Sequence, residues 1–179
     1  MQHKNKLLTC LNQARGFTLI EVLIAMLVLS IGIMGVAGMQ VTALKSLQSS
    51  HSYGMAALLA NDIADRMWVN QAQVLANAYN HTAADNNPPD CVANTCSTAQ
   101  MAAYDISQWQ QQMKGYTTAD DTVVPAMLPL SSGAVARVGT TTSFTISVRW
   151  DDDHSGSTGT TCPPASADDL DCYQLTVTF

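Results

Sequence analysis

The hydrophobic pattern separates an apolar N-terminal stretch from a mixed remainder. Residues 17–39 are almost continuously apolar and contain a single charge, Glu21. As a helix this stretch would be about 35 Å long, which is enough to cross a bilayer core of about 30 Å. Residues 40–78 contain no proline, and apolar side chains recur there every fourth residue. These positions are Met55, Leu59, Ile63 and Met67. We therefore expect the helix to continue to about residue 78 and to pack on a small domain.

The remainder of the chain changes from a helical to a strand pattern. Residues 98–114 have partly helical spacing, whereas 144–150 and 173–179 alternate apolar and polar side chains, with 134–138 as a weaker third strand. The expected loops are 81–98 and 120–132. A sheet with one apolar face needs a cover, which the long helix provides. The predicted fold class is α+β, a long N-terminal hydrophobic helix packed on a small head with a short helix and a roughly three-stranded antiparallel sheet.

The charges orient the apolar stretch in a membrane. The first sixteen residues contain Lys4, Lys6 and Arg15 and no acid. The positive-inside rule keeps this end in the cytoplasm and sends residues after 39 across the membrane. An ordinary secretory signal has a shorter apolar core than this one, but a plain signal-anchor helix is an alternative. The net charge of −6 and the lack of basic clusters argue against nucleic-acid binding.

A short motif lies at the start of the apolar stretch. Residues 15–22 read RGFTLIEV, so a glycine precedes an aromatic residue and a glutamate follows as the fifth residue after the glycine. This motif closely resembles the prepilin signature of type IV pilins and type II secretion pseudopilins. The resemblance implies that prepilin peptidase cleaves between Gly16 and Phe17 and that Phe17 is then N-methylated. Because glycine has no side chain, an extended backbone can enter a narrow protease cleft there.

The resemblance also divides the chain and gives Glu21 a role. The expected segments are a leader at 1–16, a transmembrane and assembly helix at 17–39, its continuation at 40–78 and a periplasmic head at 79–179. Glu21 is the chain's single glutamate, and ionisable residues inside apolar membrane segments are costly. The resemblance implies that Glu21 pairs with the amino group of Phe17 on a neighbouring subunit during assembly. A glutamate simply solvated at headgroup level is the alternative.

The cysteines predict disulfide bonds rather than a metal site. Cys10 lies in the expected leader, and the other four lie on the exported, oxidising side of the membrane. Three pairings are possible, and proximity in sequence favours Cys91–Cys96 with Cys162–Cys172. A zinc site is the alternative, but these spacings fit the usual short ligand pairs poorly.

An acidic run offers a second candidate for metal binding. Asp151–Asp153, followed by Gly156 and Gly159, contains oxygen ligands of the kind that calcium prefers, but it lacks EF-hand spacing. We expect a solvated acidic loop, no bound metal and no cofactor. The histidines are scattered, and no nucleophile, metalloprotease or phosphate-loop motif is present, so we expect no enzymatic activity.

Further resemblances point to one group of prepilin-like proteins. The order helix, helix and three strands resembles minor pilins and pseudopilins, and NDIADRMWVN at 61–70 is similar to the minor pilin PilV. These resemblances imply a minor pilin of a type IV pilus. Such a protein would cross the inner membrane once and would then be built into a pilus at the cell surface. It would act in assembly initiation or at the tip, and hence in adhesion or motility. The implied partners are prepilin peptidase, other minor and major pilins, and the inner-membrane pilus assembly machinery. The alternatives are a type II secretion pseudopilin and, more distantly, a membrane-tethered periplasmic calcium-binding domain.

Overall fold

The computed structural model describes residues 16–81, 89–118 and 120–179, which form two compact units. The first unit ends at Lys45 and the second is Ser46–Phe179. Helix α1, Leu19–Val69, contributes residues to both. Every described residue of the first unit is exposed. Its apolar helix surface therefore has no partner within that unit.

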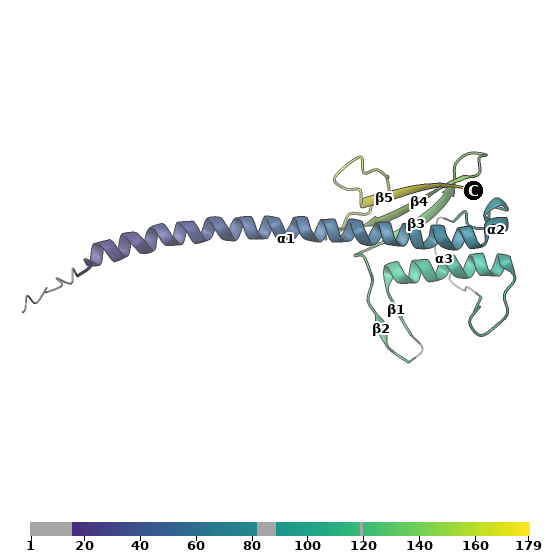
Figure 1. The fold of residues 1–179 in the computed structure, drawn as a ribbon, viewed down its shortest axis with the longest axis horizontal. Helices are drawn as coiled ribbons and strands as arrows, with labels where there is room; N and C mark the ends of the chain where they lie inside the picture. Colours follow the sequence, from purple (N-terminus) through teal and green to yellow (C-terminus); the bar gives the residue numbers. More distant parts are fainter. Residues whose placement is uncertain (1–15, 82–88, 119) are drawn as a thin grey trace, which may run out of the picture. The chain divides into compact units, whose positions relative to one another are not determined.

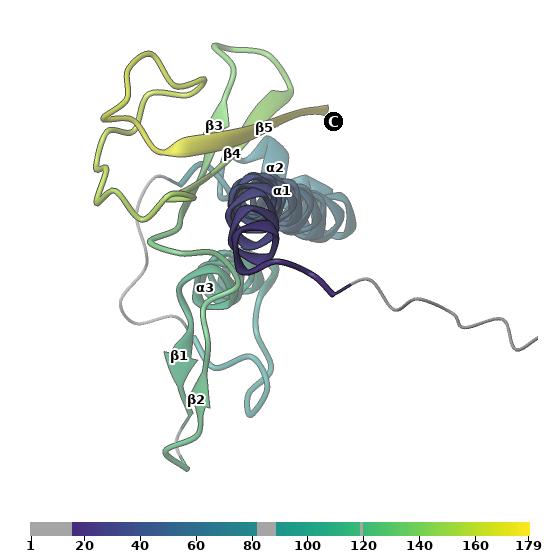
Figure 2. The ribbon, with the colours of Figure 1, turned by 90° about the vertical axis from the view of Figure 1, so that its left-hand side faces the viewer.

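The second unit contains the head. After α1 come helices α2 (Gln71–Leu75) and α3 (Thr98–Lys114), then strands β1 (Tyr116–Thr117), β2 (Val123–Val124), β3 (Ser132–Arg137), β4 (Ser143–Trp150) and β5 (Asp171–Thr178). Strands β1 and β2 pair in a small hairpin, and β3, β4 and β5 form an antiparallel sheet in that order. Within this unit, α1 lies between the three-stranded sheet and α3 (Figures 1 and 2). The predicted α+β fold, with a long helix, a short helix and a three-stranded sheet, is confirmed.

The core forms where α1 meets the sheet and α3. The predicted stripe on α1 is buried at Leu59, Ile63 and Met67, while Met55 is only partly buried. Alanines occupy the intervening buried positions of α1, which lets neighbouring elements approach closely. Trp109 of α3 is fully buried, and its indole N–H donates to the Leu59 carbonyl oxygen at 2.7 Å. The apolar side chains of β4, the central strand, complete the core: Phe144, Ile146, Val148 and Trp150.

Helix α3 begins and ends at the predicted residues. The Gln100 backbone N–H donates to Ser97 Oγ at 3.3 Å, and the Ser97 backbone N–H donates to Gln100 Oε1 at 2.9 Å. This reciprocal pair is a capping box. At the other end, Gly115 has φ 73°, and a Cβ there would lie 2.6 Å from the Ala126 nitrogen. Glycine is required at that position by both conformation and space.

Two parts of the chain differ from the expected pattern. Helix α1 ends at Val69 rather than near residue 78, because Asn70 leaves the helical conformation and its side chain donates to the Thr98 carbonyl oxygen at 2.8 Å. The separate α2 follows, and Asn77 turns the chain with φ 69°. The expected loop at 120–132 contains strand β2, which is only two residues long and offers no recognisable alternation.

Candidate functional site

The described chain begins with three residues that lead into α1. The Thr18 carbonyl oxygen accepts the backbone N–H of Glu21 at 3.1 Å, and Thr18 Oγ1 accepts the same N–H at 3.3 Å. Threonine is favoured at this position because its hydroxyl accepts an N–H of the first helical turn, where no carbonyl four residues earlier belongs to the helix. Glu21 thus lies in the first turn of the helix, where the partial positive charge of the helix terminus favours a carboxylate.

The peptide bond between Gly16 and Phe17 is accessible. Both residues precede the first helical residue, Leu19, and Phe17 is 81% exposed. Apart from Gly16 itself and its chain neighbours, no atom of the described residues lies within 4 Å of the place where a Gly16 side chain would begin. A protease could therefore approach this bond without first unwinding α1.

The first unit has the character of a membrane segment. Among the described residues, α1 is the one helix long and apolar enough to cross a membrane. Its residues before Lys45 include one charged side chain, Glu21, at the N-terminal end. The helix thus has a largely apolar surface that can contact lipid or another apolar helix without burying a charged group beyond its first turn.

The structure contains both of the expected cysteine pairs. Cys91 and Cys96 are bonded, with their Cα atoms 5.4 Å apart, and close the turn before α3. Cys162 and Cys172 are bonded, with their Cα atoms 5.7 Å apart, and tie the loop between β4 and β5 to the start of β5.

The acidic loop after β4 is held by its own carboxylates. Asp151 was expected to be solvated, but it is only 2% exposed. Its side chain accepts the backbone N–H groups of Ser155 at 3.1 Å and Gly156 at 2.9 Å. Asp169 accepts the N–H groups of Ala165 and Ser166, each at 3.0 Å. The carboxylates are therefore used to fold the loop.

The electrostatics of this loop follow from those bonds. The backbone N–H of Ala165 is the main reason that the pKa of Asp169 lies below its ordinary value. Desolvation, followed by the charge of Asp152, raises the pKa of Asp171. A cavity of about 260 Å³ lies among these side chains. Within the described residues, no three His, Cys, Asp or Glu side chains are placed to hold a metal ion.

A buried polar network joins α1 to α3, and its long-range contacts to Asp105 were not predicted from the sequence. The Tyr79 hydroxyl donates to Asp105 Oδ2 at 2.6 Å, and Arg66 Nη1 lies 3.5 Å from Asp105 Oδ1. Arg66 also pairs with Asp62, one turn earlier on α1, at 3.1 Å. Burial, and then the hydrogen bond to Asp105, raises the pKa of Tyr79. The available signal was Asp105 itself, the single acid of α3 in a partly apolar pattern.

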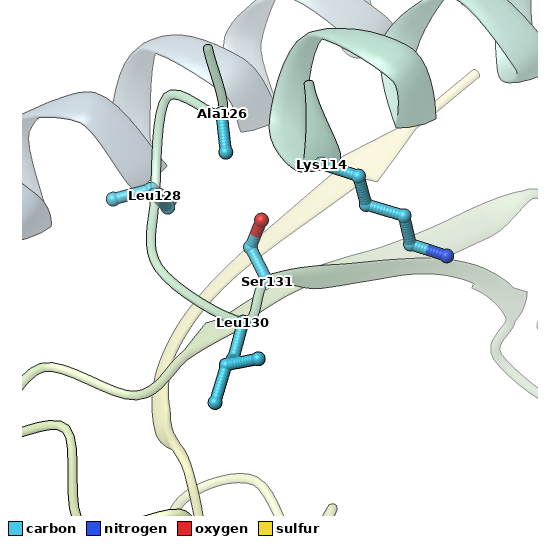
Figure 3. Close-up of a pocket in the computed structure, with 5 residues that line it drawn as sticks. All are labelled: Lys114, Ala126, Leu128, Leu130 and Ser131. Atoms are coloured by element: carbon cyan, nitrogen blue, oxygen red, sulfur yellow. The ribbon is translucent and has the colours of Figure 1, made fainter. Parts of the chain in front are cut away.

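A second cavity, of about 360 Å³, lies at the C-terminal end of α3. It is lined by Lys114, Ala126, Leu128, Leu130 and Ser131. Figure 3 shows that the side chains of Lys114 and Leu130 extend to different sides. The Ser131 hydroxyl donates to the Met113 carbonyl oxygen at 2.9 Å. These residues do not converge on one point and have no arrangement suited to acid–base or nucleophilic chemistry.

Two comparisons with protein families match adjoining parts of the chain. Residues 11–37 match the prokaryotic N-terminal methylation motif. Residues 38–107 match the Tt1218-like family, described as type IV pilin Tt1218. The chain is similar to type IV pilins. That family consists of structural pilins rather than enzymes, and the methylation motif implies processing by prepilin peptidase and assembly with other pilins. No curated protein and no solved structure gives a significant match.

Proposed function

We propose that this protein is a minor pilin of a type IV pilus, most similar to PilV. The adjoining matches to the methylation motif and to a type IV pilin family are the observation that supports it most. The fully exposed apolar helix of the first unit supports the same function, because an assembly of such helices would cover that surface.

Processing is the first step of the proposed function. Prepilin peptidase removes residues 1–16 and leaves Phe17 as the N-methylated first residue. The exposed Gly16–Phe17 bond supports this step. The processed protein then stays in the inner membrane through the helix at 17–39, with its head in the periplasm.

Assembly is the second step, and Glu21 acts there. The amino group of Phe17 in a joining subunit is positive, and Glu21 of the subunit already present provides the opposite charge. Two charges in a medium of low dielectric attract more strongly than in water, whereas an unpaired charge is costly there. The pair would therefore set the position of one helix along its neighbour. The mature subunit contributes in this way to initiation or to the tip of the pilus, and hence to adhesion or motility.

The test replaces Glu21 in the full-length protein in the producing cell. We expect Glu21→Val to be cleaved and inserted normally, because the leader and the apolar stretch are unchanged, but to be largely absent from sheared pili. Lys45→Gln is the matched control, because it removes the other charged side chain of residues 17–45 and leaves Glu21 intact. Immunoblots of membranes and sheared fibres measure both variants.

The outcomes separate the proposal from its alternatives. Wild-type amounts of Glu21→Val in sheared pili would reject the charge pair as the basis of assembly. Recovery of the wild-type protein with secretion components and not with pilus subunits would assign it to a type II secretion machine. The calcium-binding alternative is disfavoured by the acidic loop, since its buried carboxylate accepts backbone N–H groups.

A further inference from the structure

The two edges of the three-stranded sheet differ in how they are covered. On the β3 edge, Val135 exchanges backbone hydrogen bonds with His81 in both directions, at 2.7 and 2.8 Å. The Arg137 backbone N–H donates to Asn80 Oδ1 at 3.2 Å. The chain itself therefore covers the outer side of β3.

The backbone groups on the outer side of β5 follow from the register of the sheet. The Phe179 N–H donates to the Thr142 carbonyl oxygen at 3.1 Å. Because residue pairs along an antiparallel ladder alternate between bonded and non-bonded, the odd-numbered residues of β5 bond to β4. Gln174, Thr176 and Thr178 therefore direct their N–H and C=O groups away from β4.

No described residue forms a backbone hydrogen bond with these outward groups, and Gln174, Thr176 and Thr178 are exposed. The acidic loop reaches only the start of the strand, where Gln174 Nε2 donates to the Cys162 carbonyl oxygen at 3.2 Å. Proteins usually protect an edge strand with lysine, proline or a bulge. Strand β5 contains neither lysine nor proline and pairs with β4 without interruption over all eight of its residues.

The side chains on the core-facing side of β5 are also partly exposed. Its apolar side chains and the C-terminal residue pack on the core but stay partly exposed: Tyr173, Leu175, Val177 and Phe179. Aromatic residues of α1 lie near both ends of this row. Trp68, 49% exposed, contacts the Phe179 ring with centroids 4.6 Å apart. Tyr53, 42% exposed, contacts Trp150, which pairs with the first residue of β5, with centroids 4.8 Å apart.

We propose that the free edge of β5 binds an extended strand contributed by a different subunit. The incoming backbone would exchange hydrogen bonds with Gln174, Thr176 and Thr178, so a segment of about five residues, about 17 Å long, is sufficient. Every second side chain of this segment would be apolar, because it would lie beside the partly exposed side chains on the core-facing side of β5. It would lack proline wherever its own N–H meets β5. The identity of the donor as a pilus subunit rests on the proposed function, but the binding edge does not.

A second copy of this chain fits the edge poorly. If two β5 strands paired antiparallel, the two heads would be related by a two-fold axis and their α1 helices would run in opposite directions. Subunits inserted in one membrane by their N-terminal helices run in the same direction. If the two strands paired parallel through the same edges, one strand would be turned over relative to the other. The polar side chains of one, such as Gln174 and Thr176, would then lie on the same face of the sheet as the apolar side chains of the other. Each arrangement argues for a donor of different sequence.

The test uses the full-length protein in the producing cell, with a photoreactive benzophenone amino acid at Thr178. Illumination should link it to another protein, and mass spectrometry of the product identifies the linked segment. The same amino acid at Asn94, an exposed residue of the Cys91–Cys96 turn, is the control position and should give no such product.

A proline then tests whether backbone pairing is responsible. Thr176→Pro removes an N–H that points away from β4, so the sheet of the head keeps its own bonds. We expect the crosslink from Thr178 to fall about tenfold, the change in affinity that one lost hydrogen bond produces. Thr176→Ser keeps the N–H and should crosslink like the wild type. If the proline variant does not accumulate, Thr176→Lys provides the same test through an added edge charge.

Each outcome decides one question. An unchanged crosslink yield in Thr176→Pro, or in Thr176→Lys where the proline variant does not accumulate, would overturn the proposed edge, and so would the absence of a product from Thr178. A product between two copies of this chain would replace the different donor with a second copy and so reject it. A product with an extended segment of a protein outside pili would keep the edge and count against the proposed function instead.

Discussion

Tyr79 offers a sensitive probe of how the head is attached to α1. Its ring is fully buried, and its hydroxyl donates at 2.6 Å to Asp105, the carboxylate that also faces Arg66 of α1. Tyr79→Phe keeps the ring in the core and removes only the hydroxyl. The carboxylate of Asp105 would then lose its closest donor and keep Arg66 at 3.5 Å.

The expected loss follows from the type of bond. A hydrogen bond to a charged group contributes about 1.5–3 kcal/mol, so we expect the free energy of unfolding to fall by about 2 kcal/mol. For a protein of this size that corresponds to a decrease in Tm of about 4–8 °C. The cost stays below that of losing the whole side chain, since no large cavity is created.

The same residue predicts a dependence on alkaline pH. The pKa of Tyr79 is raised in the folded head, so the unfolded chain loses its phenolic proton first, near an ordinary pKa of about 10. This contribution to stability is therefore complete below about pH 10 and decreases above it, by about 1.4 kcal/mol per pH unit while the folded phenol stays protonated. Tyr79→Phe should lack this part of the decrease.

Unfolding of the full-length protein in detergent measures both effects. The fluorescence of the buried Trp109 and Trp150 follows urea unfolding between pH 7 and pH 11. Tyr116→Phe is the control, because that ring is 39% exposed and outside the network. A free energy of unfolding within about 0.5 kcal/mol of wild type for Tyr79→Phe, with the alkaline decrease retained, would refute the reasoning.

Three further predictions concern processing, the disulfide bonds and the core. Gly16→Val should leave the full-length precursor in the membrane, as intact mass would show; normal trimming would exclude cleavage at this bond. Non-reducing peptide maps should contain the two short-range cysteine pairs, each contributing up to about 2–3 kcal/mol, and free thiols in the head would contradict them. Gly133→Ala should destabilise the head by about 1–3 kcal/mol, because its Cβ would collide with Trp109; a Tm equal to wild type would show that the core can adapt.

Elements with local signals were predictable from the sequence. The membrane-length stretch, both ends of α3 and the alternating strands β4 and β5 each depend on neighbouring residues, such as the Ser97–Gln100 capping box and Gly115. The end of α1 was not predictable in this way. It depends on Asn70 bonding to the Thr98 carbonyl oxygen, 28 residues further along the chain.

The features of the candidate site also differ in whether they depend on residues that are neighbours in the sequence. The motif around Gly16 and Glu21 is contiguous and could be recognised without a structure. The Tyr79–Asp105 pair joins residues 26 positions apart, and the burial of Asp151 depends on the loop folding back on it. The free edge of β5 could not be inferred either, because strand order and the cover on β3 become known only when the sheet is formed.

The self-supporting loop between β4 and β5 has a consequence for how this protein can change over evolution. Its shape depends on Asp151 and Asp169, which lie close to its two ends, and on the disulfide bond that ties Cys162, near its middle, to Cys172 of β5. Side chains between these anchors contribute to the surface and not to the packing of α1. Substitutions there can alter the exposed surface of the head while the scaffold keeps its stability.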